Sequence, residues 1–315
     1  MISIALTVKY YHTHIKKASK TACFSERFPI YYVSMRIIKR LFIVLLVLAL
    51  LALGVWYGNN SIQTDAYSFT SPGLPSEFDG FRIVQLSDLH GRSFGEGNSR
   101  LIAAVERAEP DMIAITGDLV DAQSELEEVL PFIRKLLELA PVYYVTGNHE
   151  WGSGKARDTL GALRSLGVEC LENRFVSVER GGAHILIAGV NDPNGPSDQK
   201  TPEQLAAELY ASEPNPFWLL LAHRNNLFSG GYCCLGANLT LCGHAHGGVW
   251  RLPFTDGLIG PDKRPLPSFT SGFYRCEDGC GMWVFVSRGL GNSPHYMPRL
   301  FNRPQVAVIT LNTDG

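Results

Sequence analysis

The sequence predicts an α/β domain that follows one membrane-spanning helix. From residue 81 onward, short β-branched and aliphatic runs alternate with segments whose apolar residues recur at helical spacing. Before that, residues 41–57 form an uninterrupted apolar run of 17 residues, at the lower limit of the length that spans a bilayer. With 315 residues, 45% of them hydrophobic, the chain has room for one α/β domain of ~250 residues plus an N-terminal appendage.

The apolar run is asymmetrically flanked by charge. Arg36, Lys39 and Arg40 precede it, whereas residues 58–80 contain no Lys or Arg. Because positive residues stay on the cytoplasmic side of a membrane, we expect a single-pass protein of the cell membrane. Its N-terminus would lie in the cytoplasm, and the domain that follows the run would lie outside.

Two other interpretations of the run are a cleaved signal peptide and a buried core helix. Signal peptides usually have a shorter apolar stretch, of ~7 to 15 residues, and residues 58–61 offer no small-residue cleavage site. We therefore predict an uncleaved signal-anchor at residues 35–57, which begins at Met35. Residues 1–34 are then a start-site extension, residues 58–80 a Ser/Thr/Pro/Gly-rich linker, and residues 81–315 the domain.

Within the domain, the two periodicities assign the elements in order. Helical spacing predicts helices at residues 100–108, 126–139, 160–166 and 202–211. Short apolar runs predict strands at residues 83–86, 112–115, 142–145, 185–190, 217–222, 239–241, 283–286 and 306–311. No helical pattern separates the last two strands, so we expect the chain to end in hairpins or at sheet edges.

The charge balance and the cysteines restrict the functional classes. Twenty-eight Lys and Arg against 30 Asp and Glu leave a net charge of -2, so no general nucleic-acid binding is expected. Cys233, Cys234 and Cys242 lie in or beside apolar segments and are interpreted as buried thiols. Cys276 and Cys280 flank a turn-forming tripeptide, so in an oxidising compartment they would pair across a hairpin tip.

Potential metal ligands follow five of the strand-like runs. The segments are Ser87-Asp88-Leu89-His90, Gly117-Asp118, Gly147-Asn148-His149-Glu150, His223-Arg224 and Gly243-His244-Ala245-His246. Ligands of open α/β sheets bind outside the carboxyl ends of strands, where such loops converge. Five of the seven histidines beyond residue 34 fall in these segments. Oxygen and nitrogen donors without cysteine favour divalent Mn, Fe, Zn or Co.

Each segment alone also fits an ordinary turn, helix cap or loop histidine. The two histidines of Gly243-His244-Ala245-His246 reach one cluster only if the loop bends, which glycines 243, 247 and 248 would permit. Asp121 and Asp192, near strand ends, are interpreted as turn residues. The joint occurrence and order of the five segments carry the inference.

In that order, the five segments resemble the calcineurin-like metallophosphoesterase superfamily, whose pattern is D-x-H, G-D, G-N-H-[DE], H and G-H-x-H. The chain looks most like the bacterial membrane-associated branch, because of the glycines that follow His246 and the segments at residues 287–291 and 299–304. The resemblance covers residues 81–311. It departs at residues 222–226, where relatives often carry a Pro-Asp pair soon after the histidine.

The resemblance implies a two-sheet β-sandwich flanked by helices, with two metal ions in one site. Asp88, His90 and His246 would hold one cation; Asn148, His223 and His244 would hold the other. Asp118 would bridge them, and the two cations would activate a hydroxide that attacks phosphorus.

Several neighbours of the implied site have open roles. His149 would protonate the leaving oxygen or stabilise the transition state, or it would only orient a carboxylate. Glu150 is interpreted as a supporting or helix-start residue. Arg92, Arg224 and Arg288 would contact phosphate or have structural roles.

The expected function is therefore hydrolysis of a phosphoester or pyrophosphate bond in a phosphorylated small molecule or a lipid-linked substrate at the membrane. One alternative is a nucleotide or nucleic-acid phosphodiesterase. Another is a non-catalytic metal-binding protein on the same fold, although such proteins lack one or more of the ligands that are all present in this sequence. Fold-level resemblance does not name the substrate or the metal, because substrate choice lies in loops around the site.

Overall fold

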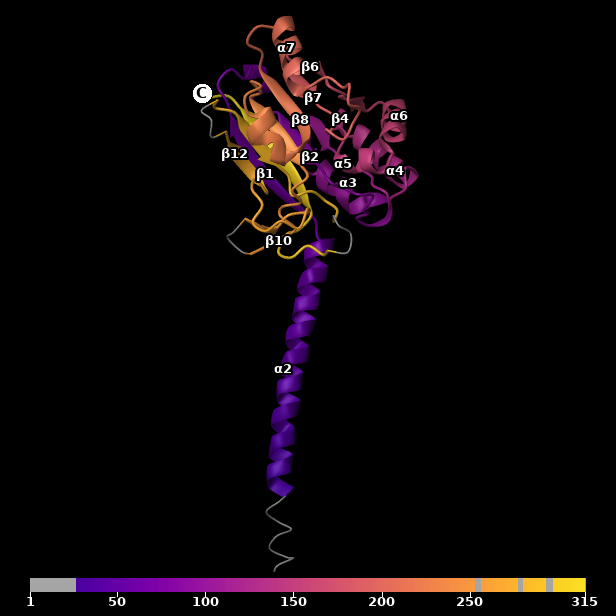
Figure 1. Cartoon of the computed structure of the whole chain (residues 1–315), viewed down its shortest axis with the longest axis vertical. Helices are drawn as coiled ribbons and strands as arrows, with labels where there is room; N and C mark the ends of the chain where they lie inside the picture. The colour runs from indigo at the N-terminus through magenta and orange to yellow at the C-terminus, as the bar shows by residue number, and fades with distance from the viewer. Residues whose placement is uncertain (1–26, 253–255, 277–279, 293–296, 315) are drawn as a thin grey trace, which may run out of the picture. The chain divides into compact units, whose positions relative to one another are not determined.

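The computed structural model describes residues 27–252, 256–276, 280–292 and 297–314, with side chains from residue 34 onward. The chain divides into two units, Met1–Gly54 and Val55–Gly315. Helix α2 (Arg27–Asn60) is labelled in Figure 1. Its residues up to Gly54 belong to the first unit, and its last residues, from Val55, belong to the second. Its portion Ser34–Asn60 has a mean hydropathy of 2.6, and is long and apolar enough to cross a membrane. The predicted start-site extension falls mostly on residues outside the described part.

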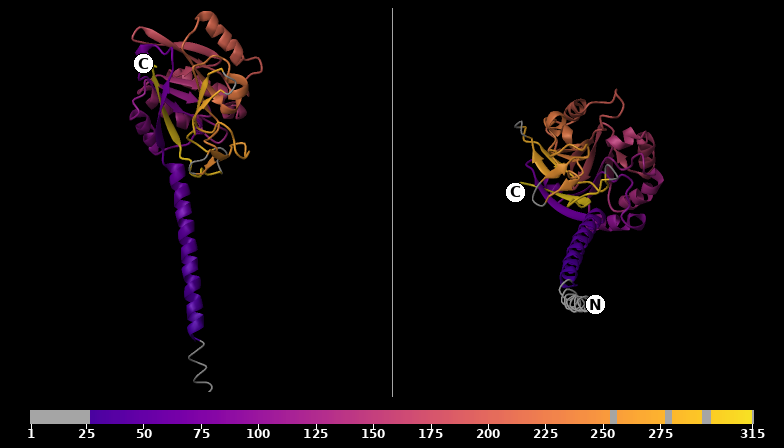
Figure 2. Two further views of the ribbon diagram at one scale, coloured as in Figure 1. Left: turned by 90° about the vertical axis from the view of Figure 1, so that its left-hand side faces the viewer. Right: turned by 60° about the horizontal axis from the view of Figure 1, so that its bottom comes forward.

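The second unit contains two six-stranded sheets (Figures 1 and 2). The first has the order β1-β14-β2-β3-β4-β5, in which β2 to β5 run parallel. Its strands are β1 (Gln63–Thr70), β2 (Arg82–Leu86), β3 (Met112–Thr116), β4 (Val142–Val145), β5 (Glu169–Cys170) and β14 (Gln305–Asn312).

The second sheet has the order β12-β13-β9-β8-β7-β6, with β7, β8, β9 and β13 parallel. Its strands are β6 (Arg174–Arg180), β7 (Ala183–Gly189), β8 (Trp218–Arg224), β9 (Leu239–Gly243), β12 (Gly272–Arg275) and β13 (Trp283–Val286). A separate hairpin pairs β10 (Trp250–Arg251) with β11 (Gly257–Ile259).

Alternating side chains build three apolar layers. On β2, Ile83 joins the core between the two sheets, while Val84 points into the core beneath the helices. The first sheet is covered by α3 (Ser99–Glu106), α4 (Leu126–Leu137) and α6 (Ala156–Leu166). The second is covered by α7 (Pro202–Ser212) and by the turns η3 (Asn225–Leu227) and η4 (Phe228–Tyr232). The predicted two-sheet sandwich flanked by helices is confirmed, and Figure 2 shows the helices outside the sheets.

Two parts of the sequence-based prediction are wrong. Residues 58–80 are not only a linker, because β1 lies within them and pairs in parallel with β14 over eight residues. The predicted C-terminal strands are not at sheet edges either: β14 lies between β1 and β2, and β13 lies between β12 and β9. The expected terminal hairpin is present as the antiparallel pair β12 and β13.

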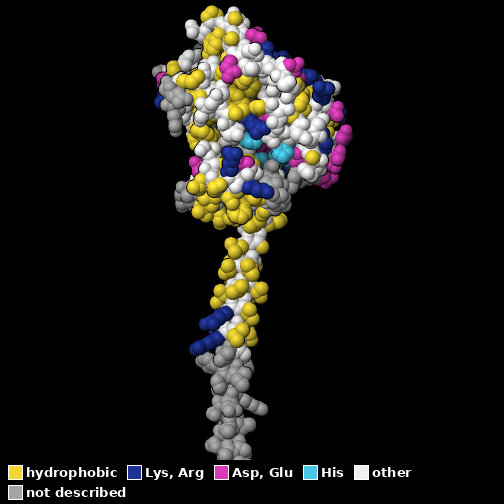
Figure 3. Space-filling view, in the orientation of Figure 1, with side chains coloured by type: hydrophobic (Ala, Val, Ile, Leu, Met, Phe, Trp, Pro, Cys, Tyr) yellow, Lys and Arg dark blue, Asp and Glu magenta, His cyan; other side chains and the backbone are white. Residues whose placement is uncertain are grey.

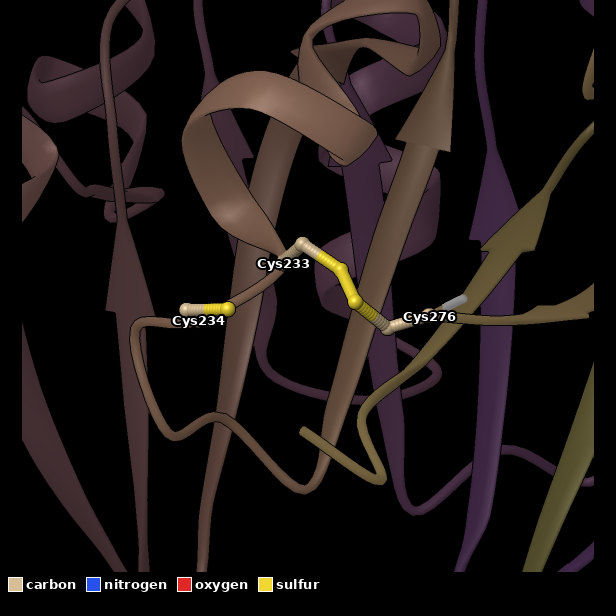
Figure 4. Close-up of side chains that lie close together, drawn as sticks. All are labelled: Cys233, Cys234 and Cys276. Carbon is tan, nitrogen blue, oxygen red and sulfur yellow. A yellow bond between two sulfur atoms is a disulfide. The ribbon is translucent and has the colours of Figure 1, made fainter. Parts of the chain in front are cut away.

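The predicted cysteine pairing is also wrong. Cys276 bonds to Cys233, as Figure 4 shows, and Cys280 bonds to Cys234, so Cys233 and Cys234 are not free thiols. Cys242 is a buried free thiol, as predicted, and so is Cys170. The two adjacent cysteines thus tie the segment after η4 to both ends of the β12–β13 connection.

We expect the disulfides to contribute measurably to stability. Replacing Cys233, Cys276, Cys234 and Cys280 together with Ser should lower the free energy of unfolding by about 2–4 kcal/mol, because the two neighbouring bonds close one long loop in the unfolded chain and either of them alone would keep it closed. The sequence separations of the two pairs are 43 and 46 residues. Urea unfolding of the detergent-solubilised full chain measures the effect. Reductant should destabilise the native protein and leave the variant unchanged; equal stabilities without reductant would show that the bonds do not form.

Candidate metal centre

The predicted ligands are all placed at the carboxyl ends of strands. From the first sheet, Asp88 and His90 follow β2, Asp118 follows β3, and Asn148 starts α5 (Asn148–Gly152) after β4. From the second sheet, His223 lies near the end of β8, while His244 and His246 follow β9. The site therefore lies where the ends of the two sheets meet, and the structure brings all seven side chains together.

Asp88, His90 and His246 form one donor cluster, with their ligand atoms within 4.8 Å of one another. The Nε2 atoms of His90 and His246 are 3.3 Å apart, and His246 Nε2 is 3.4 Å from Asp88 Oδ1. All three residues are buried. Three lone-pair donors that face one point are suited to a cation.

His223 is the centre of a second cluster. Its Nε2 atom lies 3.1 Å from Asn148 Oδ1 and 3.2 Å from His244 Nδ1. The Nδ1 atom of His223 lies 2.9 Å from the Thr116 carbonyl oxygen, which fixes the ring with Nε2 facing the cluster.

Asp118 lies between the two clusters. Its Oδ2 atom is 3.1 Å from His223 Nε2 and 3.8 Å from His90 Nε2. The other oxygen, Oδ1, accepts a hydrogen bond of 2.8 Å from the His149 backbone N–H. One carboxylate oxygen is thus shared by both donor sets, which is the arrangement that two adjacent cations require.

The electrostatics of the pocket also fit bound cations. Burial opposes a charge on His223, but the neighbouring Asp118 carboxylate outweighs it and raises the pKa of His223 to about 10. The surroundings of Asp118 thus favour positive charge at this point. Burial lowers the pKa of His246, and burial together with charged His223 lowers the pKa of His244 to about 3. Both rings are therefore neutral, the form that binds metal.

The ligands are held in an uncommon backbone conformation. Asp88, His90, Asp118, His244 and His246 all have positive φ, between 49° and 67°. Non-glycine residues seldom adopt this left-handed region, and it persists where the surroundings over-determine it. Five strained residues among seven ligands indicate that the fold maintains this geometry for function.

The loop after β9 bends differently from the sequence-based expectation. The histidines themselves turn the chain, with φ of 67° at His244 and 49° at His246, followed by Gly247 and Gly248 with positive φ. Gly243 has another role: a Cβ there would collide with the Ser87 hydroxyl and lie 2.7 Å from Asp88 Oδ2. Its lack of a side chain lets the two sheets approach at the site.

Glu150 supports the ligand loops from beneath. Its buried carboxylate accepts hydrogen bonds from the backbone N–H groups of Asp118, Leu119, Val120 and Gly147, at 2.6 to 3.1 Å. Burial and the nearby Asp118 charge raise the pKa of Glu150 to about 7. The supporting role proposed from the sequence agrees with these contacts.

Asp121 has a role that the turn interpretation missed. Its Oδ2 atom lies 3.1 Å from His90 Nδ1, so it orients the ring whose Nε2 faces the donor cluster. Its Oδ1 atom also accepts from the backbone N–H groups of Gln123 and Ser124, as a turn residue does. A short polar residue three positions after a bridging carboxylate was the available signal.

Arg299 and Asn302 were also missed as site residues. The guanidinium Nη2 of buried Arg299 lies 3.4 Å from His246 Nδ1, and Asn302 Nδ2 donates to the His246 carbonyl oxygen at 2.7 Å. Both lie in a segment that the resemblance singled out without giving it a role. Only the fold shows that this late segment lies against His246.

The three arginines considered as phosphate contacts have different surroundings. Arg92 donates to Asn292 and to the Asn59 carbonyl, and Arg288 pairs with Asp65 at 2.9 Å. Both guanidinium groups contact residues other than the predicted ligands. Arg224, next to His223, makes a two-pronged contact with buried Asp192 at 2.6 and 3.1 Å, and a fifth of its side chain remains exposed.

His149 is at the open side of the site. Its ring packs edge-on against His90, with centroids 4.7 Å apart, and it lies within 4.8 Å of Asp118 and His90 by ligand atoms. Unlike the deeper ligands it is only half-buried, and burial lowers its pKa. A cavity of about 420 Å³ opens on another side of the site and includes His244 in its wall.

The chain is similar to several known proteins. It is 28% identical to the metallophosphoesterase YkuE of Bacillus subtilis, over 80% of this chain and 86% of that one. It is 28% identical to phosphodiesterase YaeI of Escherichia coli, over 73% of this chain and 82% of that one. It is 30% identical to a bovine transmembrane protein with a metallophosphoesterase domain, over 69% of this chain but half of that longer protein.

A family model agrees with these similarities. Residues 81–248, more than half of the chain, match the model described as calcineurin-like phosphoesterase. The matched range begins at β2 and ends just after His246, so it contains all seven predicted ligands. The chain therefore belongs to the calcineurin-like phosphoesterase family.

Proposed function

We propose that the chain is a membrane-anchored phosphohydrolase that uses two divalent cations to cleave a phosphoester or pyrophosphate bond. The observation that carries this proposal is the position of Asp118, whose Oδ2 atom lies 3.1 Å from His223 Nε2 and 3.8 Å from His90 Nε2. A metal site of one cation needs no such shared carboxylate. Two donor sets around one buried acid support a binuclear centre of Mn, Fe, Zn or Co.

The chain's residues would divide the work in the following way. Asp88, His90 and His246 would hold one cation, Asn148, His223 and His244 the other, and the Asp118 carboxylate would reduce the repulsion between them. Bound cations would acidify a water molecule and stabilise charge on the phosphoryl oxygens. Glu150 and Asp121 would keep Asp118 and His90 oriented, so that no ligand has to move during turnover.

His149 is suited to proton transfer. Its ring lies beside the shared carboxylate yet is partly exposed, so it can reach a bound phosphoester without leaving the pocket. We propose that it donates a proton or hydrogen bond to the leaving oxygen.

Several observations support anchoring with the domain outside the cytoplasm. The apolar part of α2 can span a membrane, Arg36, Lys39 and Arg40 precede it, and a relative is named as a transmembrane protein. The two disulfides form in oxidising compartments, which agrees with an extracytoplasmic domain.

A panel assay tests the proposed reaction. Purified full-length protein, loaded with each candidate metal, is given an aryl phosphodiester, phosphomonoesters, nucleotides and a lipid-linked pyrophosphate. Hydrolysis of at least one, together with two metal ions per chain, is expected. Preference for nucleotides would favour the alternative function of a nucleotide or nucleic-acid phosphodiesterase. Metal binding without any hydrolysis would favour a non-catalytic protein.

Asp118→Asn should abolish turnover and leave the fold intact. The amide keeps the size of the side chain but removes the shared negative charge, so we expect kcat to fall about 10³-fold or more. Circular dichroism and thermal unfolding check the fold, and elemental analysis should find fewer than two metal ions per chain. Unchanged activity would contradict the bridging role.

His149→Asn should slow catalysis without loss of metal. If the ring protonates the leaving oxygen, kcat should fall about 10²–10⁴-fold on an alkyl phosphodiester and less on a p-nitrophenyl ester, whose leaving group needs no proton. Both esters are assayed on the same metal-loaded preparation. Equal losses on the two would assign His149 to transition-state stabilisation or to orientation of a carboxylate.

A further inference from the structure

Three large apolar side chains are exposed on one end of the domain. They are Leu252, Leu266 and Phe301, with 47%, 74% and 63% of their surfaces exposed, and we call them the apolar rim. Figure 3 shows hydrophobic side chains gathered at this end, in the region that Figure 1 labels β10. Clusters of this kind commonly mark an interaction site.

The rim is one surface built from three segments. Leu252 directly follows β10, where the Arg251 backbone N–H donates to the Leu300 carbonyl at 2.9 Å, next to Phe301. Leu266 donates its N–H to the Leu258 carbonyl of β11 at 2.9 Å, and β11 pairs with β10. Backbone hydrogen bonds therefore hold the three side chains in a common region.

The same surface is fastened to the last turns of α2 that belong to the domain. The Asn59 side chain accepts from the Arg299 backbone N–H and donates to the Arg299 carbonyl, both at 2.9 Å. The Arg303 guanidinium lies 5.3 Å from the centre of the Tyr57 ring. Phe301 thus lies in a segment fixed at both ends to residues 57–59, where the apolar run of the helix ends.

From this arrangement we propose that the apolar rim enters the surface of the membrane that α2 crosses, so that the metal centre takes its substrate from that membrane. Chain length limits how far the rim can lie from the bilayer, because Asn59 is two residues beyond Tyr57. The loop that carries Leu266 also contains Asp262, Lys263 and Arg264, a net charge of one positive; the Arg264 side chain is 84% exposed and pairs with Asp262 at 3.1 Å. Cations beside apolar residues suit an anionic lipid surface.

The loop with Leu266 also connects the rim to the metal centre. The cavity of about 420 Å³ is lined by His244 and also by Arg264, Leu266 and Phe269. A phosphate at the ligands could therefore extend an attached chain along this cavity toward the rim. The substrate class is an amphiphile, a phosphoester or pyrophosphate with a long hydrocarbon chain. This assignment rests on the proposed function.

Contact with lipid is tested by fluorescence. The full chain is reconstituted in nanodiscs after Phe301→Cys is labelled with an environment-sensitive dye, without reductant. Ala207→Cys, exposed on α7, is the matched control. Both variants also carry Cys23→Ser, because Cys23 lies outside the described residues. Cys170 and Cys242 are buried, and the other described cysteines are in disulfides. Brominated lipid should quench the label at position 301 at least threefold more than the one at 207. Equal quenching would overturn the proposal, and a signal that depends on chains per disc would assign the rim to a second copy.

Substrate access is tested with two esters that share a leaving group. One is bis(p-nitrophenyl) phosphate, and the other is hexadecyl p-nitrophenyl phosphate in vesicles with anionic lipid. The variant Leu252→Ser with Phe301→Ser changes the rim but no residue of the cavity wall. Its kcat/KM should fall at least fivefold on the hexadecyl ester and stay within twofold on the soluble ester. Equal effects on both would overturn the access role. If the native chain cleaves the soluble ester but not the hexadecyl ester, the substrate assignment fails and the proposed function stands. If it cleaves neither ester and no substrate of the panel, the proposed function fails as well, while quenching still decides membrane contact.

Discussion

The structure depends on keeping the Asp118 carboxylate buried between two sets of donors. A buried carboxylate is costly unless positive charge or hydrogen bonds compensate it. His223 Nε2, 3.1 Å away, and the His149 backbone N–H, 2.8 Å away, supply part of that compensation. The remaining lone pairs face the ligands of both clusters. The two sheets must therefore end at the same place, because each of them contributes ligands to the clusters.

The apolar layers offset the strain at this end of the sheets. Left-handed backbone at a non-glycine residue costs of order 1–3 kcal/mol, and five ligands have it. Strands β2 and β3 bury side chains on both faces, so their ends cannot shift without disturbing two cores. Glu150 adds a rigid connection, since one carboxylate holds four backbone N–H groups from the β3 and β4 loops. The positions of the ligand side chains are thus determined mainly by the packing of the strands beneath them and by Glu150.

The difference between local packing and long-range contacts explains what the sequence could predict. Strongly apolar runs such as Val142–Val145 and Trp283–Val286 are strands with the predicted bounds, because burial on both faces leaves a local signal. Gln63–Thr70 was missed since it is polar and mostly half-exposed, and its pairing with β14 is a contact across the whole chain. The disulfides and the contacts of Asp121 and Arg299 were missed for a similar reason, since they too join residues that are distant in the sequence. Their partners are set by tertiary structure, on which spacing along the chain carries little information.

If the site holds two cations as proposed, access would matter more for substrate choice than the chemistry of the ligands does. A pair of cations and a shared carboxylate would act on many phosphoesters, so the ligand set alone discriminates weakly. Segment 299–303 contacts both the metal centre and the end of α2. Arg299 contacts His246 and Asn59, and Asn302 donates a hydrogen bond to the His246 carbonyl. The same five residues therefore fix one metal ligand, the end of α2 and the exposed ring of Phe301. If α2 crosses a membrane as proposed, selectivity would come from where the centre is held, because a site fixed through Asn59 near the end of that helix would meet membrane-bound phosphates first.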